Sequence, residues 1–290
     1  MPSFKSYLSI LFCCITFGLL SQNYGRVPNQ EFGIHLGVAN YMGDLSSTNN
    51  NLGLQARAFR PAGGIFYRNN FTRFTSFRSS FTIGQIVGDD SWAADPNLRQ
   101  RNLHFKSNIT EINMMFEWNI LPFYIGHFKY KFTPFIGVGI AGFMFNPKAE
   151  LDGRWIALQP LGTEGQGLIE YPERTKYSKV SVSIPFSFGF KWNVSDYIAM
   201  GIEIQYRYLF TDYLDDVSTV YPNLSYYNNN YVDALASEAA ALSYRGLNEN
   251  PGNIEGKSRG NPDNNDTYFF IMLKASYSIG RGSGSCPTFK

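Results

Sequence analysis

The stretch VSVSIPFSFGFKW, residues 180–192, decides the fold of this chain. Its even-numbered positions, from Val180 to Trp192, all carry large apolar side chains, while Ser, Pro, Gly or Lys occupies the odd ones. A period of two is that of a β-strand, whose successive side chains point to opposite faces, and an amphipathic helix would not produce it. Residues 197–210 repeat the alternation after a tight link at residues 193–196, so both stretches are predicted to be strands.

Alternation, or a weaker glycine-rich form of it, extends over six further parts of the chain. The predicted strands cover residues 31–41, 61–69, 73–88, 103–120, 132–145, 178–192, 197–210 and 267–279. Eight antiparallel strands close into a small barrel. We therefore expect an all-β chain with a single eight-stranded antiparallel barrel.

Residue size indicates which face of the barrel lies outside. Trp, Phe, Ile and Tyr follow one another along the apolar face, whereas the other face carries mainly Gly, Ser, Ala and Asn. A soluble, lipocalin-like barrel would instead be dense in Lys and Glu on its water-facing surface. The small side chains are thus expected to fill a narrow interior, and the apolar face is expected to contact lipid, as in a transmembrane β-barrel.

Link lengths give an independent argument for the same class. The links at residues 69–73 and 193–196 are tight and that at 121–131 is moderate, but those near 42–60, 88–103, 146–177 and 211–266 are long. Bacterial outer-membrane barrels alternate short periplasmic turns with long external loops in this way. Aromatic residues near strand ends are predicted to form the interfacial girdles: Trp118, Trp192, Tyr197 and Phe210.

The interior face also carries charges of both signs that nearly balance. Charged groups persist in a narrow lumen of low dielectric constant only when they are paired. We therefore predict a ladder of salt bridges in place of an open pore. Its predicted members are Arg78, Glu111, Glu117, Lys179, Lys191, Glu203, Arg207 and Lys274.

Composition excludes two broad classes of protein. With 17% aromatic and 17% charged residues among 290, the chain does not resemble a disordered one, which is poor in aromatics and rich in charge. With 25 basic against 23 acidic residues, it lacks the strong basic field of a nucleic-acid-binding protein, and no nucleic-acid partner is expected.

The N-terminal residues are typical of a secretory signal peptide. Lys5 precedes an apolar stretch, residues 7–20, that is too short to span a bilayer. We expect residues 1–22 to be removed on export and residues 23–290 to form the outer-membrane barrel domain. Cys13 and Cys14 would leave with the signal peptide, so Cys286 alone remains and no intramolecular disulfide is expected.

No sequence pattern predicts a catalytic, cofactor or metal site. Residues 137–142 match the dinucleotide pattern G-x-G-x-x-G, but the alternation continues through them, so Gly137 and Gly139 are better explained as making room inside the barrel. His35, His104 and His127 lack metal-ligand spacing, and no G-x-S-x-G occurs. An outer-membrane acyltransferase or lipase remains an alternative.

Two acidic clusters lie in the long links. Asp89 with Asp90, and Asp212 with Asp215 and Asp216, are interpreted as a solvated loop face, with calcium binding as the alternative.

An ordered series of motifs gives a resemblance to a known family. The motifs lie at residues 40–44, 60–68, 88–90, 101–103, 145–149, 158–167, 211–218 and 286–287. Together they resemble the PorG-like family of Bacteroidetes, outer-membrane β-barrels with a DUF6089-type domain that are associated with type IX protein secretion. The external-loop residues of these motifs include Gln159, Pro160, Gly162, Glu164, Gly165, Asp212, Asp215 and Asp216.

The resemblance implies a structural role without enzymatic activity. Family members are thought to tie a periplasmic ring, built from PorK-like lipoproteins and PorN-like proteins, to the outer membrane. Periplasmic residues would then contact the ring or the lipid: Arg73, His127, Lys129, Lys131, Arg281 and Lys290. No cofactor and no small-molecule substrate is expected. The alternative is a cell-surface binding protein or outer-membrane enzyme that acts through its external loops.

Overall fold

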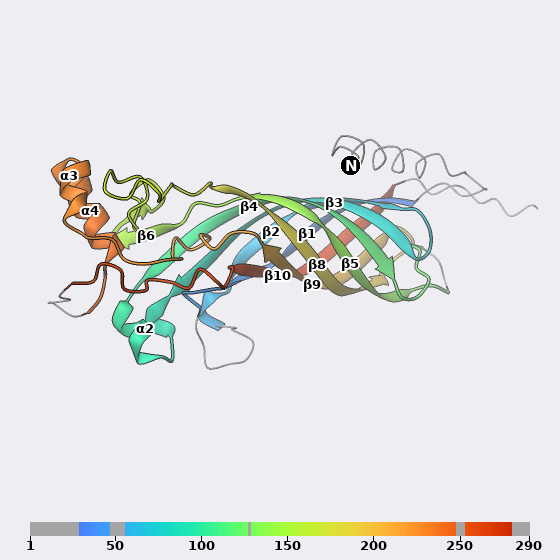
Figure 1. Ribbon diagram of the computed structural model, residues 1–290. Helices are drawn as coiled ribbons and strands as arrows, with labels where there is room; N and C mark the ends of the chain where they lie inside the picture. Colours follow the sequence, from blue (N-terminus) through green and yellow to red (C-terminus); the bar gives the residue numbers. More distant parts are fainter. Residues whose placement is uncertain (1–28, 47–55, 127–128, 248–252, 280–290) are drawn as a thin grey trace, which may run out of the picture.

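The computed structural model describes residues 29–46, 56–126, 129–247 and 253–279 (Figure 1). The predicted signal peptide and Cys286 lie outside the described residues. The barrel is built from β1 (Asn29–Met42), β2 (Arg60–Asn70), β3 (Thr75–Asp89), β4 (His104–Asn119), β5 (Phe132–Met144), β8 (Val180–Asn193), β9 (Ile198–Leu209) and β10 (Thr267–Ile279). Seven of the eight strands begin or end one or two residues away from the predicted bounds, and β10 has the predicted bounds at both ends.

The strands form a closed antiparallel barrel. Neighbouring strands follow the order β3, β2, β1, β10, β9, β8, β5, β4, and pairing of β3 with β4 closes the circle. The predicted fold class, an eight-stranded antiparallel all-β barrel, is confirmed. No helix in the described part of the chain is long and apolar enough to cross a membrane.

Alternation along each strand divides its side chains between the two faces of the barrel. On β9, Ile198, Met200, Ile202 and the following even-numbered residues are exposed, whereas the odd-numbered residues from Ala199 to Leu209 are all buried. The same division on the other barrel strands gives the exterior a belt of exposed Phe, Ile, Leu, Val, Met and Tyr side chains.

Of the predicted girdle residues, Trp118, Tyr197 and Phe210 are exposed and Trp192 is half-buried.

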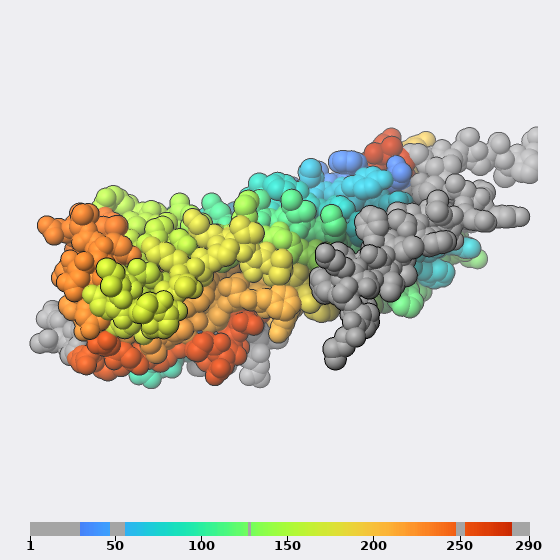
Figure 2. Space-filling view, turned by 45° about the horizontal axis from the view of Figure 1, so that its top comes forward, coloured from blue at the N-terminus to red at the C-terminus, as the bar shows by residue number. Residues whose placement is uncertain are grey.

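The two ends of the barrel differ in size. At the short-turn end, where β1 begins and β10 ends, residues 71–74, 120–131 and 194–197 join the strands. At the long-loop end, four long connections join them, and Figure 2 shows residues 150–170, 225–247 and 253–260 gathered at one end of an elongated molecule. These connections contain the hairpin of β6 (Lys148–Leu151) and β7 (Arg154–Ala157) and the helices η1 (Ala56–Ala58), η2 (Asp90–Trp92), α2 (Pro96–Arg101), α3 (Tyr226–Asn230) and α4 (Asp233–Ser243).

The largest apolar core of the described residues lies at the long-loop end. It joins upper barrel residues such as Tyr41, Phe105 and Tyr268 to connection residues such as Leu161 and Tyr227. We call residues 145–179 and 210–266, as far as they are described, together with η2 and α2, the cap. The cap is therefore a packed continuation of the barrel and does not consist of separate loops.

A lysine placed in the exterior belt tests whether that belt faces lipid. Ile204 lies near the middle of β9 with half of its side-chain surface exposed. For Ile204→Lys we expect a loss of about 2–4 kcal/mol in the free energy of unfolding from lipid vesicles, because a cation near the bilayer midplane is poorly solvated. Urea titration in vesicles measures it. Val232→Lys, at an exposed cap position, is the control and should change stability by no more than about 0.5 kcal/mol; equal effects of the two variants would contradict a lipid-facing belt.

Candidate functional site

A buried carboxylate, Glu117 on β4, organises the charges inside the barrel. Its oxygens lie 2.9 Å from Arg68 Nε, 3.0 Å from Arg78 Nε and 2.6 Å from Lys191 Nζ. All four side chains are at most 5% exposed. Ser76 also donates a hydrogen bond to Glu117. One carboxylate therefore balances part of the charge of three cations from three different strands.

Other interior contacts cross the barrel from one wall to the opposite one. Both terminal nitrogens of Arg78 on β3 donate to Glu203 on β9 at 2.8 Å, and these strands are four positions apart in either direction around the barrel. Tyr268 on β10 likewise donates to Glu111 on β4 at 2.6 Å, and Arg207 pairs with the same carboxylate at 2.7 and 3.0 Å. At these levels the lumen is occupied by paired side chains.

The structure places most of the predicted ladder residues together and corrects one. Lys274 pairs with Glu203, so Arg78, Glu111, Glu117, Lys191, Glu203, Arg207 and Lys274 all lie in the interior network. Lys179 does not: it is exposed just before β8 begins, and its carbonyl accepts a hydrogen bond from the Phe145 amide. The alternation that faces Ser181 and Ser183 inward does not extend to Lys179, because the chain there already belongs to the cap.

Glu31 and Arg68 also belong to the network, although neither is among the predicted ladder residues. Arg68 lies 2.6 Å from Glu31, which also accepts hydrogen bonds from Asn70 and Ser276. The alternation could have identified both residues. Glu31 precedes the outward-facing Phe32 and Arg68 follows the outward-facing Tyr67, so both side chains must point inward.

Gly137 and Gly139, two of the three glycines of the dinucleotide pattern, serve packing. They lie within the continuous strand β5. A Cβ on Gly137 would lie 2.7 Å from Met115 Sδ, and one on Gly139 would lie 2.1 Å from the Met114 carbonyl oxygen. Both glycines therefore permit close approach to β4.

The described histidines have structural partners. His35 Nε2 lies 3.1 Å from Thr82 Oγ1 inside the barrel, and His104 Nε2 accepts a hydrogen bond from the Glu150 amide. Within the described residues, no group of three or more His, Cys, Asp or Glu side chains has an arrangement that could hold a metal ion.

Removing the charge of Glu117 tests the interior network. For Glu117→Gln we expect a loss of about 3–5 kcal/mol in the free energy of unfolding, because buried cations lose their shared counter-charge. Urea unfolding in lipid vesicles measures it. Glu238→Gln, which removes one partner of the more exposed Arg154–Glu238 pair, should cost less than about 1 kcal/mol. Equal, small losses would show that the interior charges are not coupled.

Four of the five residues of the two acidic clusters are buried, which corrects the interpretation of these clusters as a solvated loop face. Asp212 is 8% exposed, and Asp90, Asp215 and Asp216 are at most 1% exposed. Asp90 pairs with Arg101 at 2.7 Å and accepts from the Leu103 amide, and Asp89 caps η2 through the Ser91 amide. These four carboxylates are buried because the connections fold onto one another, which sequence polarity alone does not reveal.

The predicted loop motifs form the centre of the cap. Glu164 accepts hydrogen bonds from the Ser218 and Thr219 amides and from Arg259. Asp216 accepts from Thr163 and Tyr177 and lies 3.6 Å from Arg259. These contacts join residues 158–167 to residues 211–218, and both carboxylates share the single positive charge of Arg259.

The remaining motif residues shape the backbone of the cap. Gln159 donates to the Tyr177 carbonyl, the Pro160 carbonyl accepts from Lys176, and the Gly162 carbonyl accepts from Tyr227. Gly162 and Gly165 have φ values of 62° and 86°, which favour glycine.

A second group of carboxylates meets at the top of the barrel. Tyr41 Oη lies 2.5 Å from Asp215 and 2.8 Å from Asp266, whose other oxygen accepts from the Leu214 amide. Burial raises the pKa of Asp215 and of Asp266 well above the usual value, and neighbouring carboxylates reinforce the shift. Burial also raises the pKa of Asp212 to about 7, with the charges of Asp44 and Glu164 adding to the effect.

The raised pKa of Asp212 makes cap stability depend on pH. The folded state binds a proton here more tightly than the unfolded chain, so stability is lost as pH rises towards 7. We expect Asp212→Asn to raise the midpoint of thermal unfolding by a few degrees at pH 8 and by a smaller amount at pH 5, because stability is lost across the whole interval between the unfolded-state pKa of 3.8 and the folded-state pKa of about 7. Scanning calorimetry at both values measures this. The exposed Asp263→Asn is the control; a gain for Asp212→Asn that is the same at both pH values would contradict the assignment.

At the short-turn end, the connection between β4 and β5 is fixed across the barrel mouth. The Phe123 amide and the Asn119 side chain donate to the Arg73 carbonyl, and Asn193 donates to the carbonyls of Tyr124 and Tyr130. Phe123 and Ile125 are buried with Ala199 in a small apolar cluster. The described part of this connection therefore forms a well-defined surface at the short-turn end of the barrel.

That surface is basic and aromatic. The Arg73 guanidinium lies 5.7 Å from the Tyr130 ring centroid and donates to its hydroxyl at 3.3 Å, and the Lys129 ammonium lies 5.9 Å from the same ring. Arg73, Lys129 and Lys131 are exposed. The structure thus brings three of the predicted periplasmic residues to one end. The other three, His127, Arg281 and Lys290, lie outside the described residues.

Comparison with known proteins gives one family and several distant structural similarities. The family described as "domain of unknown function (DUF6089)" matches residues 5–157, more than half of the chain. No curated protein matches. The chain is similar to the solved structure of Ail, the attachment invasion locus protein of Yersinia pestis, with 9% identity, a TM-score of 0.40 and coverage of 87% of this chain and 99% of that one. For Neisserial surface protein A the values are 8%, 0.40, 86% and 97%, and for OprG from Pseudomonas aeruginosa they are 10%, 0.39, 88% and 98%.

Proposed function

This chain belongs to the DUF6089 family, and from that premise we propose that it is an exported, non-enzymatic outer-membrane barrel of the type IX secretion machinery. It anchors or stabilises a periplasmic ring of PorK-like and PorN-like proteins at the outer membrane. Residues 1–22 are the signal peptide that directs export, and residues 23–290 form the barrel domain. The proposed partners are inferred from the resemblance of the sequence motifs to the PorG-like family.

The outer-membrane location is supported by the exterior belt. Exposed apolar side chains surround a barrel whose charged side chains lie inside, which is the reverse of the distribution on a water-soluble protein. With the long connections outside the cell, the short-turn end faces the periplasm.

An anchoring role is supported by the filled lumen. Arg78 and Glu203 join opposite walls of the barrel, and Glu111 binds partners from both β9 and β10. A barrel that is crossed in this way is rigid, and it does not offer an open path for solute. The role of the barrel in anchoring is then to hold its two ends at fixed positions on the two sides of the membrane.

The observation that carries the proposal is the ordered basic surface at the short-turn end. Lys129 and Lys131 are exposed beside Tyr130 on the connection between β4 and β5, which is hydrogen-bonded to the turn at residues 71–74 and to the end of β8. Arg73 of that turn is exposed next to the Tyr130 ring. Arginine and lysine beside an aromatic ring recognise carboxylates or lipid phosphates at a membrane surface. An acidic face of the ring is the partner that this surface would take.

Reversing the three charges tests the anchor. In cells that carry Arg73→Glu, Lys129→Glu and Lys131→Glu together, we expect recovery of PorK-like and PorN-like proteins with the tagged barrel to fall at least about tenfold, because an acidic surface repels an acidic partner. Quantitative mass spectrometry of affinity-purified, detergent-solubilised outer membranes measures it. The barrel itself should remain in the membrane at normal abundance.

The matched control reverses three exposed cations at the long-loop end: Arg57→Glu, Lys179→Glu and Lys257→Glu. This variant should recover the ring proteins as the wild type does. Undiminished recovery from the short-turn variant would remove the basic surface as the contact site, and absence of ring proteins from the wild-type purification would remove the anchoring role.

A further inference from the structure

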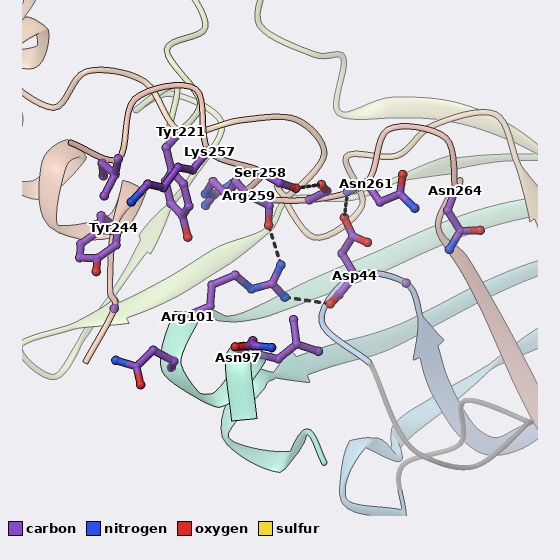
Figure 3. Close-up of a pocket in the computed structure, with 16 residues that line it drawn as sticks. Asp44, Asn97, Arg101, Tyr221, Tyr244, Lys257, Ser258, Arg259, Asn261 and Asn264 are labelled. Atoms are coloured by element: carbon purple, nitrogen blue, oxygen red, sulfur yellow. Dashed lines mark hydrogen bonds between the residues drawn. The ribbon is translucent and has the colours of Figure 1, made fainter. Parts of the chain in front are cut away.

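A cleft of about 690 Å³ opens at the side of the cap. It lies between α2 on one side and residues 253–264 on the other, and Gly43 and Asp44 after β1 complete its wall (Figure 3). The cleft is at the opposite end of the molecule from the basic surface of the short-turn end. Anchoring as proposed above does not use it.

The floor of the cleft is a fixed arginine. Arg101 pairs with Asp90 through two hydrogen bonds and donates to the carbonyls of Asp44, at 2.9 Å, and Arg259, at 2.5 Å. Only 11% of its side chain is exposed. Because these contacts neutralise Arg101 and tie together three segments of the cap, the cleft is preorganised and its floor adds little net charge.

The walls of the cleft offer uncharged polar groups and aromatic rings. In Figure 3, Tyr221 and Tyr244 lie on one side, Asn261 and Asn264 on the other, and Asn97 lies below. The two tyrosine rings meet edge to face, 5.7 Å apart. Each asparagine amide provides both donors and an acceptor, and each tyrosine combines an apolar ring with a polar hydroxyl.

The charges around the cleft nearly balance, with three cations against four carboxylates. Arg259 is paired with Glu164 and Asp216, and Arg101 with Asp90. Lys257 and Asp44 are of opposite sign and lie on different walls. A strongly charged ligand would find only a small net charge here, and a purely apolar ligand would leave the amides without hydrogen bonds.

We propose that this cleft binds a short, uncharged oligosaccharide. Sugar hydroxyls donate and accept in pairs, which matches amide side chains, while the C–H faces of pyranose rings pack against tyrosine and against the apolar residues Leu98 and Ile254 at the cleft wall. The volume is in the range of sites for ligands of this size. Because the cap would face the exterior of the cell, the ligand is a glycan at or near the cell surface.

Ligand-observed saturation-transfer NMR on the purified full-length barrel tests the proposal. The barrel is held in lauryldimethylamine oxide micelles, because the head group of a glycoside detergent is itself a sugar. The probes are maltotriose, mannotriose and chitotriose, with a heparin hexasaccharide as the anionic comparison. We expect at least one neutral trisaccharide to bind and the heparin fragment to bind no more tightly.

Variants locate the binding site. Asn97→Ala and Asn264→Ala should each weaken the bound trisaccharide about fivefold to tenfold, the effect of about one lost hydrogen bond. Tyr244→Phe, which keeps the ring and therefore the packing, should weaken it by a smaller factor than Tyr244→Ala. Asn228→Ala, an exposed asparagine of α3 outside the cleft, is the matched control and should leave binding unchanged.

Three results would overturn the proposal. The first is absence of binding by all three neutral probes to a wild-type barrel with the expected strand-rich circular dichroism spectrum. The second is binding of the heparin fragment alone. The third is neutral-sugar binding that the cleft variants leave unchanged. None of these results bears on recovery of the ring proteins, so this test and that of the anchor are independent.

Discussion

A membrane-spanning strand must satisfy every backbone donor and acceptor within the protein, because lipid offers no hydrogen bonds. Pairing of β3 with β4 meets this requirement by closing the barrel. Closure with only eight strands leaves an interior that side chains alone can fill. Apolar residues occupy the outward face, so the polar residues of each strand lie inside the barrel and contact one another there.

The interior network follows from that confinement. Glu117, Glu203 and Glu111 each bind cations or hydroxyls from more than one strand, and some of these contacts join opposite walls. Buried charges of this kind add little net stability compared with apolar packing, but they penalise any register in which a partner is missing. A shift of one residue in any strand would turn its charges towards lipid. The network therefore specifies the register of the barrel.

The two ends of the molecule use the rigid barrel differently. At the short-turn end, the connection between β4 and β5 lies across the barrel mouth and presents Lys129 and Lys131 beside Arg73 of the neighbouring turn. At the long-loop end, the cap continues the barrel core upward and leaves a polar cleft at its side. Because the barrel is rigid, a partner bound at one end lies at a fixed position relative to the other end of the molecule. An anchor with a glycan-binding outer surface would connect a periplasmic assembly to the cell exterior.

Local sequence determined most of the barrel and little of the cap. Period-two alternation indicated all eight strands and placed Arg78, Glu117 and Glu203 on the inner face, because side-chain direction in a strand is set by the residue's own position. Which charges pair was decided only by tertiary structure, since Arg78 and Glu203 are 125 residues apart and meet because their strands lie on opposite walls. The cap shows the same limit more strongly. Asp215 and Asp216 resemble solvated loop residues in the sequence, yet they are buried, because irregular connections have no period from which their contacts can be derived. The cleft likewise exists only where α2 and residues 253–264, far apart along the chain, come together in space.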